Sequence, residues 1–182
     1  MLLTASLSAT LPLSAASHVD VVKMRTENQV NPLGIGTSTP RFSWQITSDR
    51  KGVVQTSYQI LVASSREKLD RNEADLWNSG ERNSDEQLWI PYQGKALLSG
   101  AQAYWKVRIT TNRGKSEWTE PQLFSIGLLG ETKWSGTWIG LEDLQPGEQK
   151  GMHTRLAARY IRKDFAAKGK VKRAVAYVAG LG

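Results

Sequence analysis

Between Val19 and Gly127 the chain consists of short runs of β-branched and aromatic residues separated by turn residues. The separators are Gly- and Pro-containing pairs such as Asn31-Pro32, Lys51-Gly52 and Ser79-Gly80. The runs predict seven strands, Val19–Met24, Arg41–Ile46, Ser57–Ala63, Asp75–Asn78, Gln87–Tyr92, Ala103–Thr111 and Gln122–Ile126. Seven short strands in roughly a hundred residues are typical of an all-β sandwich of the immunoglobulin or fibronectin type III kind.

The alternation inside the strands predicts which side chains face the core. Every second residue of a half-buried strand is apolar, and two of the runs follow this rule closely. In the run Ser57–Ala63, the side chains of Tyr58, Ile60 and Val62 are predicted to share one face, and those of Gln59, Leu61 and Ala63 the other. In the run Ala103–Thr111, Trp105, Val107 and Ile109 are predicted to point inward, while Tyr104, Lys106 and Arg108 form a basic outer face.

One connection is predicted to be helical. Ser64–Ala74 is rich in charged residues that favour helices, and Glu67 lies three residues after Ser64. A Ser followed three residues later by an acid is the pattern of a helix N-terminal cap. We therefore expect a short helix with Ser64 as its cap.

The first 18 residues predict a leader. Leu2 to Leu13 is an apolar run, and the small residues Ser14-Ala15-Ala16 follow it, as in the second half of a secretory signal. The basic start of such a signal is absent, which suggests a start codon assigned too far downstream. The run is too short and interrupted to span a bilayer, so we expect an exported protein, periplasmic, cell-surface or secreted, without a transmembrane segment.

The net charge of +7 is concentrated at the end of the chain. Residues 150–182 contain nine Lys or Arg and one acid, Asp164, whereas residues 1–149 contain 15 basic and 16 acidic residues. Such a tail, interleaved with Tyr160, Phe165 and Tyr177, could follow a phosphate backbone. The preferred interpretation is a solvated strand face with acidic neighbours in further sequence, so no nucleic acid partner is expected.

Seven Trp and no Cys set the candidate chemistry. The absence of Cys excludes thiol chemistry and Cys-based zinc sites. Trp44, Trp77 and Trp105 lie in apolar runs and are predicted to be core. Trp89, Trp118 and Trp134 adjoin polar or turn residues, and of these Trp89 and Trp118 are the candidate sugar-contacting aromatics, with packing or domain docking as the alternative.

No other residue pattern predicts a chemical site. Adjacent residues on a strand point to opposite faces, so Asp85-Glu86 and Glu142-Asp143 are interpreted as solvated loop charges. His18 and His153 lie in irregular segments, and no metal ligand set is predicted. The glycines around Ile35 and from Gly127 to Gly130 lack phosphate-loop spacing, so we predict no cofactor.

An ordered series of motifs resembles the start of the bacterial α-L-rhamnosidases. The series is Asn31-Pro32-Leu33-Gly34, Pro40-Arg41-Phe42-Ser43-Trp44, Gln55 to Ser64, Asp75-Leu76-Trp77-Asn78-Ser79-Gly80, Tyr104-Trp105-Lys106-Val107-Arg108, Trp118 before Phe124, and Trp134-Ser135-Gly136-Thr137-Trp138-Ile139-Gly140. Arg159–Phe165 and Lys172–Gly182 are similar to the opening strands of the family's next domain. The resemblance covers nearly all of the chain after the leader.

The leader pattern and the resemblance together predict four segments. These are a leader over 1–18, a fibronectin type III-like sandwich over 19–128, a linker over 129–151, and the truncated start of a jelly-roll-like β domain over 152–182. Without further strands to pair with, this last part is expected to be disordered or prone to aggregation.

The resemblance also implies the role of this region. Such enzymes hydrolyse terminal α-L-rhamnosides with inversion, using two carboxyl groups of a helical barrel. Nothing in this sequence corresponds to that barrel, so no catalytic residue is assigned. The chain is predicted to be a non-catalytic accessory region whose partners are the other domains of the parent enzyme and, through it, rhamnose-containing glycans. A carbohydrate-binding or cell-surface adhesion module is the alternative.

Overall fold

The computed structural model describes residues 19–130, 134–140, 147–148 and 160–180. Its regular elements are nine strands and one short helix within residues 19–130, so this part is all-β as predicted. Their bounds are β1 Val19–Thr26, β2 Arg41–Ser48, β3 Gln55–Ala63, α1 Arg66–Asp70, β4 Trp77–Asn78, β5 Arg82–Asn83, β6 Ile90–Pro91, β7 Gln102–Thr111, β8 Gly114–Lys115 and β9 Gln122–Ser125.

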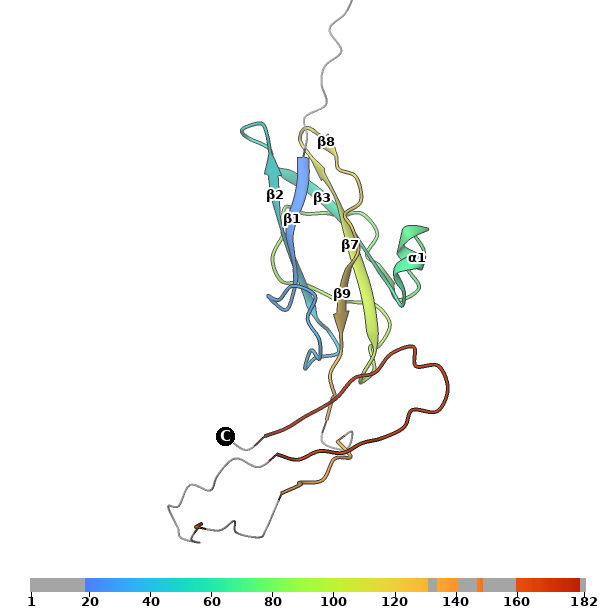
Figure 1. Cartoon of the computed structure of the whole chain (residues 1–182). Helices are drawn as coiled ribbons and strands as arrows, with labels where there is room; N and C mark the ends of the chain where they lie inside the picture. The colour runs from blue at the N-terminus through green and yellow to red at the C-terminus, as the bar shows by residue number, and fades with distance from the viewer. Residues whose placement is uncertain (1–18, 131–133, 141–146, 149–159, 181–182) are drawn as a thin grey trace, which may run out of the picture. The chain divides into compact units, whose positions relative to one another are not determined.

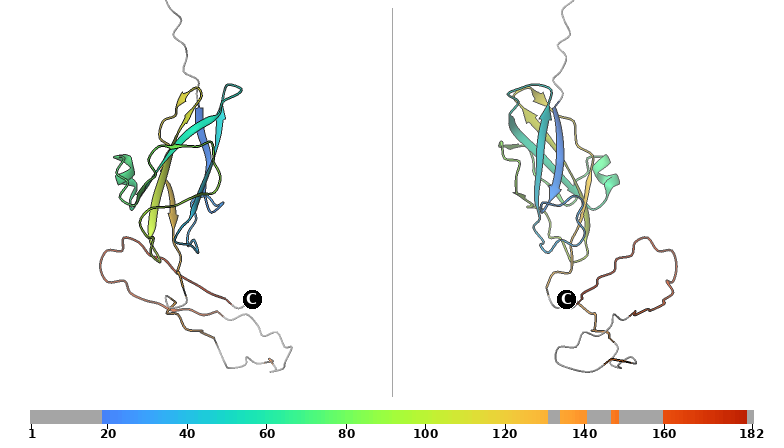
Figure 2. Two further views of the ribbon diagram at one scale, coloured as in Figure 1. Left: turned by 180° about the vertical axis from the view of Figure 1, so that it is seen from behind. Right: turned by 60° about the vertical axis from the view of Figure 1, so that its left-hand side comes forward.

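Two antiparallel sheets make the sandwich (Figures 1 and 2). The three-stranded sheet has the order β1-β2-β6. In the six-stranded sheet β3 and β7 are the long central pair, flanked by β4, β5, β8 and β9. Residues from the inner faces of both sheets interdigitate, which is the immunoglobulin-like arrangement expected from the sequence.

Phe42 of β2 lies at the centre of the core and is fully buried. Its ring centroid is 4.5 Å from that of Trp105 on β7 and 5.7 Å from that of Phe124 on β9. The rings of Trp77 and Tyr92 lie 6.3 and 6.5 Å away. Aromatic pairs at these separations add to the free energy already gained by burying their area, and here they join both sheets and one loop.

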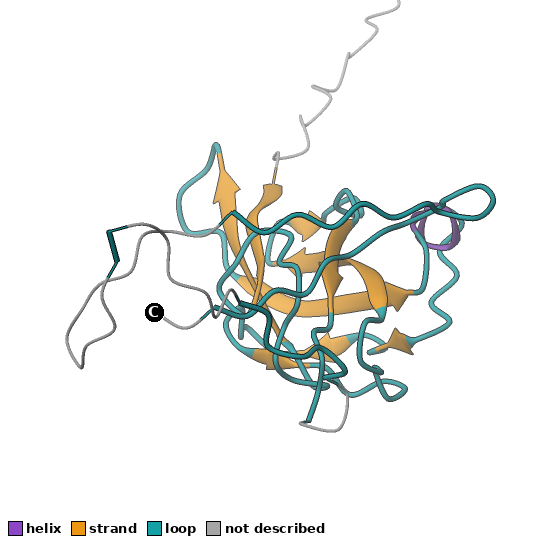
Figure 3. Ribbon diagram, turned by 60° about the horizontal axis from the view of Figure 1, so that its bottom comes forward, coloured by secondary structure: helices purple, strands orange, loops and turns teal. Residues whose placement is uncertain are grey.

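The predicted alternation of β3 is confirmed, since Ile60 and Val62 belong to the main core while Leu61 and Ala63 lie on the opposite face. The expected basic outer face of β7 is partly wrong, because Lys106 is only 5% exposed. Helix α1 covers this face, outside the strands (Figure 3). The Lys106 ammonium donates hydrogen bonds to the Leu69 carbonyl and to Asn72 Oδ1, and burial lowers its pKa.

Helix α1 is shorter than the predicted Ser64–Ala74, and its N-terminal cap is Ser65 instead of Ser64. Ser64 donates to the Asp75 carboxylate, through its backbone N–H at 2.9 Å and its hydroxyl at 2.7 Å. Burial alone would raise the pKa of Asp75, but hydrogen bonds from Lys68 and Ser64 lower it to about 2. The helix ends because Asn72 adopts a left-handed backbone, with φ of 60°.

The other differences from the predicted strands concern short elements. β5 and β8 were not predicted, since each pairs only two residues and lies in a segment with turn composition. The expected strand Gln87–Tyr92 is reduced to β6, because Trp89 has φ of 58° and cannot continue an extended ladder.

The chain divides into two compact units, residues 1–135 and 136–182. In the second unit the described residues 160–180 contain no helix or strand, and all are exposed. The expected strands Arg159–Phe165 and Lys172–Gly182 are therefore absent from the described residues, where no partner strand is available for a ladder. The domain assignment itself stays a prediction.

Gly94 allows the loop after β6 to pack closely against β4. A Cβ at this position would lie 2.5 Å from the Leu76 carbonyl oxygen, the Trp77 Cβ and the Tyr92 hydroxyl. That hydroxyl donates to the Lys95 carbonyl at 2.7 Å, and Lys95 N–H donates to the Leu76 carbonyl at 3.0 Å. The missing side chain thus lets the loop after β6 lie directly against the start of β4.

We predict that Gly94→Ala lowers the free energy of unfolding by more than about 2 kcal/mol, because backbone atoms must move to admit the methyl group. Chemical denaturation measures the loss. Gly36→Ala is the matched control, since a Cβ there meets nothing within 4 Å, and its effect should stay within about 0.5 kcal/mol. Equal effects of the two substitutions would contradict the packing argument.

Candidate functional site

The two candidate sugar-contacting aromatics occupy different environments. Trp118 is half-buried and packs against the outer cluster of Leu61, Ala63 and Leu69. Its ring also faces two cations, with Lys106 Nζ 5.2 Å and Arg108 Cζ 4.5 Å from the ring centroid. These contacts favour packing for Trp118. Its role in sugar contact stays a prediction.

Trp89 is an exposed indole held in a strained position. The backbone of Trp89 is left-handed, and the residue is 40% exposed. The Trp89 N–H donates to Ser43 Oγ at 3.0 Å, and the Arg41 guanidinium carbon lies 4.1 Å from the ring centroid. The Trp89 ring is thus held by a cation–π contact while part of its surface stays open to solvent.

Arg41 is itself fixed by Glu27. The Glu27 carboxylate accepts hydrogen bonds from Arg41 N at 2.7 Å, Nε at 3.1 Å and Nη2 at 2.8 Å. The hydrogen bond from Arg41 is the main cause of the lowered pKa of Glu27. A carboxylate that binds the guanidinium in this forked geometry leaves little freedom to the cation above the indole.

Gln55 anchors the segment before Trp89 to the sandwich. This side chain is buried, accepts from Trp44 Nε1 at 3.1 Å, and donates to the Ser84 and Glu86 carbonyls at 3.0 and 2.9 Å. Trp44 N–H donates to the Gln87 carbonyl at 3.0 Å. Residues 84–87 are therefore held against β2 and β3 although they form no regular strand.

A hollow of about 540 Å³ lies between the C-terminal half of β2 and the segment that contains Asp85 and Gln87. Its lining comes from the end of β2, the hairpin toward β3 and residues 85–87. The polar side chains include Gln45, Gln87 and Asp85, with Arg50 on the hairpin side. The amides of Gln45 and Gln87 have no hydrogen-bond partner among the described residues, so they are available to a ligand.

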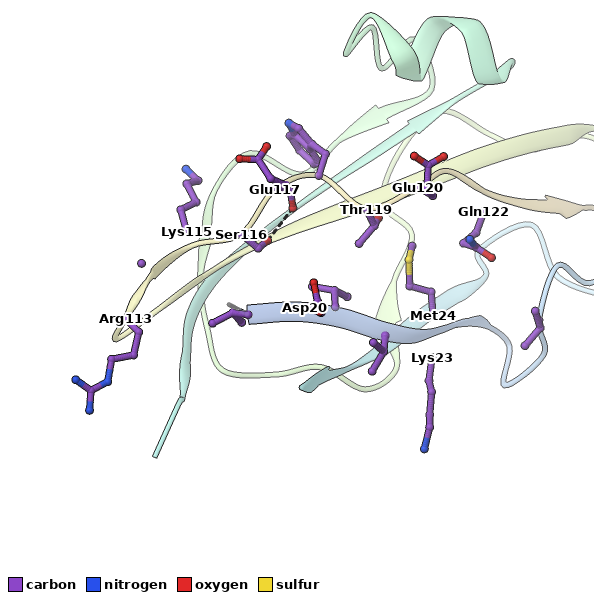
Figure 4. Close-up of a pocket in the computed structure, with 16 residues that line it drawn as sticks. Asp20, Lys23, Met24, Arg113, Lys115, Ser116, Glu117, Thr119, Glu120 and Gln122 are labelled. Atoms are coloured by element: carbon purple, nitrogen blue, oxygen red, sulfur yellow. Dashed lines mark hydrogen bonds between the residues drawn. The ribbon is translucent and has the colours of Figure 1, made fainter. Parts of the chain in front are cut away.

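A larger groove of about 890 Å³ runs between β1 and residues 113–122 (Figure 4). Figure 4 shows Met24 directed toward the Thr119–Glu120 wall and Lys23 directed away from it. β1 pairs only with β2 among the described residues, so its second edge borders the groove. The bulge at Lys23, with φ of 50°, and the charge of Asp20 interrupt that edge in the way edge strands are protected.

The described residues bring no metal ligand set together, because no group of three His, Cys, Asp or Glu side chains lies close enough. Asp85 and Glu86 are exposed, as predicted for loop charges. Glu142, Asp143, His18 and His153 lie outside the described residues. Among the helices that can be described, none is long and apolar enough to cross a membrane.

An antiparallel sandwich of two sheets around an aromatic core defines an immunoglobulin-like domain. The family model described as "Rha78A-like, N-terminal immunoglobulin domain" matches residues 21–130, which is more than half of the chain. The chain therefore belongs to this family, as the motifs indicated.

Curated relatives agree with the family match. An α-L-rhamnosidase of Formosa agariphila is 35% identical over 181 residues, which covers 91% of this chain and 19% of the relative. An α-L-rhamnosidase of Alteromonas sp. is 34% identical over 158 residues, covering 86% of this chain and 17% of the relative. The chain thus spans about a fifth of the length of these relatives.

Solved structures show the same relation. The Streptomyces avermitilis α-L-rhamnosidase complexed with L-rhamnose matches with a TM-score of 0.64 and 35% identity, over 68% of this chain and 12% of that one. The α-L-rhamnosidase of Dictyoglumus thermophilum matches with a TM-score of 0.64 and 34% identity, over 68% of this chain and 14% of that one. In these single chains the matching region is a small part.

Sequence reasoning found Trp89 but missed its surroundings. Gln45 and Gln87 belong to no motif and Gln55 only begins one, and the three side chains meet because β2, β3 and the segment after β5 converge. The signal that could have pointed to them is the break in the Gln87–Tyr92 run, where Leu88 and Trp89 place two large apolar residues side by side and disturb the alternation.

We predict that Glu27→Gln lowers the free energy of unfolding by roughly 1 kcal/mol or less at pH 7, the range of exposed ion pairs. The folded-state pKa of Glu27 is lowered, so its stabilisation is present above the unfolded pKa and is lost as pH falls through the folded value. Denaturation at several pH values should show the variant and the original chain converging in acid. A difference independent of pH would contradict the charge-based explanation.

Proposed function

We propose that this chain is the non-catalytic N-terminal region of an α-L-rhamnosidase, and that it serves as a rigid module from which the following chain emerges. The family match and the small share of each relative that it spans support this assignment. The parent would act on terminal α-L-rhamnosides, and its remaining domains would be the partners of this region.

The match of this chain to a domain that is a small part of each relative carries the non-catalytic assignment, and the pKa directions of the described carboxyl groups agree with it. An inverting glycosidase needs one carboxyl group with a raised pKa as general acid, facing a second carboxylate. Each described carboxyl group whose pKa is shifted has a lowered pKa, and most are hydrogen-bonded to basic side chains. These groups are Glu27, Glu67, Glu73, Asp75 and Glu81. A lowered pKa favours the ionised form, which is the opposite of the change that a general acid requires.

The rigid exit of the sandwich supports the structural half of the proposal. Beyond β9 the backbone is hydrogen-bonded on two sides. On one side Gly127 N–H donates to the Ile35 carbonyl at 2.8 Å, and on the other Gly100 N–H donates to the Ile126 carbonyl at 3.1 Å. Leu129 N–H then donates to Ser99 Oγ at 2.9 Å. The chain therefore leaves the sandwich along a fixed path up to Leu129.

The catalytic half of the proposal is tested with p-nitrophenyl α-L-rhamnoside and the whole chain. We expect no nitrophenol release above the buffer blank under conditions in which the Streptomyces avermitilis enzyme, run as positive control, is active. Release that scales with the concentration of this chain and falls in an Asp85→Asn, Glu86→Gln variant would overturn the proposal. If the variant releases as much nitrophenol as the original chain, the assay is repeated after a second purification to remove contaminating enzymes. Activity that persists after this step would also overturn the proposal.

The structural half predicts slow hydrogen exchange at the exit. The amides of Gly127 and Leu129 should exchange at least tenfold more slowly than the amide of Gly130, because they are hydrogen-bonded to the neighbouring loops. Amide exchange followed by NMR measures each rate. Ser99→Ala should accelerate exchange at Leu129 and leave Gly127 unchanged. Equal rates at all three amides would show that the path is not fixed.

A further inference from the structure

We propose that Trp89 and the hollow beside Gln45 and Gln87 form a binding site for a neutral oligosaccharide of pyranose rings. The proposal goes beyond the non-catalytic role argued above and does not depend on it. It concerns the three-stranded sheet and the segment from residue 84 to Trp89, and it begins from the indole that the fold keeps exposed.

The first argument is the preorganised aromatic surface. Pyranose rings bind proteins by laying their C–H face on an aromatic ring, which requires an indole that is partly open and does not need to be ordered on binding. Trp89 meets this requirement, because Ser43 fixes its backbone and Arg41 fixes its ring. The side chain of Leu88, the residue before Trp89, is also exposed.

The second argument is the polar lining of the hollow. Sugar hydroxyls both donate and accept hydrogen bonds, and amide and carboxylate groups supply the complementary partners. Gln45 and Gln87 offer two unpartnered amides, and Asp85 offers a carboxylate. The volume of about 540 Å³ lies in the range of small-ligand sites. The backbone of Gln87 is pinned by Trp44, so this wall is rigid.

The third argument is spacing and charge. Gln87, which lines the hollow, and Trp89 are only two residues apart in the chain. A glycan of two or more rings can therefore place one ring on the indole and the hydroxyls of its neighbour in the hollow. Arg41 is neutralised by Glu27, and Asp85 lines the hollow together with Arg50, so no excess charge selects an acidic sugar.

Trp118 and the β1 groove are weaker candidates for the same ligand. Trp118 is covered by two cations and packs on an apolar cluster, which leaves its ring less open. The groove lined by β1 contains Trp118 but is otherwise bordered by interrupted strand edges. Within the described part of the chain, the Trp89 site is the one that combines an exposed ring with amides that lack a hydrogen-bond partner.

The test uses the whole chain and isothermal titration with neutral hexasaccharides, such as those of cellulose, xylan, mannan and rhamnan. Affinity electrophoresis in gels containing the corresponding polysaccharides gives a second readout. We expect at least one neutral glycan to bind. Trp89→Ala should weaken that binding at least tenfold, and the Gln45→Ala, Gln87→Ala double variant should weaken it severalfold.

Trp134→Ala is the matched control. Trp134 is exposed to a similar extent, 44%, but its backbone is not left-handed and no cation of the described residues stacks on it, so its loss should leave binding unchanged. Thermal unfolding confirms that each variant is folded, and Trp89→Gly, which removes the ring and adopts the left-handed backbone without strain, replaces Trp89→Ala if the latter unfolds. The proposal is overturned by no binding to any neutral glycan at millimolar concentration, by binding to acidic polysaccharides alone, or by binding that the Trp89 variants retain in full.

Discussion

The packing of four aromatic rings around Phe42 is the constraint on which the sandwich depends. Phe42 belongs to the three-stranded sheet, whereas Trp105 and Phe124 belong to the six-stranded sheet. Trp77 and Tyr92 come from a two-residue strand and a loop that have few backbone bonds of their own. Because each ring buries a large apolar area, this cluster fixes the distance between the sheets and orders the irregular segments at the same time.

Buried polar side chains hold the irregular segments that the aromatic cluster alone does not fix. Gln55 and Lys106 are among the most buried polar residues, and each satisfies backbone carbonyls of a segment that is not part of a ladder. Gln55 holds residues 84–86, and Lys106 holds the C-terminal end of α1, where an unpaired carbonyl would otherwise face a covered surface. Trp105 Nε1 is an exception among the described residues, since it is buried without a partner. Such a group costs about 1–3 kcal/mol, which the surrounding aromatic packing must offset.

The long strands and the core could be predicted from the sequence because they rest on local alternation. Ile60 and Val62 on β3, with Trp105, Val107 and Ile109 on β7, lie where the period of two places them. The position of Lys106 could not be predicted, because it depends on α1 folding back over the outer face of the sheet. The conformation of Trp89 also depends on distant residues, Ser43 and Arg41, which no local pattern connects to it. The sequence thus indicated Trp89 as a candidate, whereas the hollow beside it could be recognised only from the three-dimensional structure.

The backbone at Trp89 separates this residue from an incidental surface aromatic. A left-handed conformation costs a residue with a side chain about 1–2 kcal/mol, and glycine would adopt it without that cost. The hydrogen bond to Ser43 and the stacking of Arg41 offset part of this free energy, and Arg41 in turn requires Glu27. Three residues from two segments, Arg41 and Ser43 on β2 and Glu27 after β1, therefore hold one indole partly open to solvent, beside a hollow lined by Gln45 and Gln87. By contrast, Trp118 packs on the apolar cluster of Leu61, Ala63 and Leu69, and Arg108 stacks on its ring. Its backbone is not left-handed. Glycine at position 89 would remove this backbone strain. A tryptophan there despite the strain indicates that its side chain has a function.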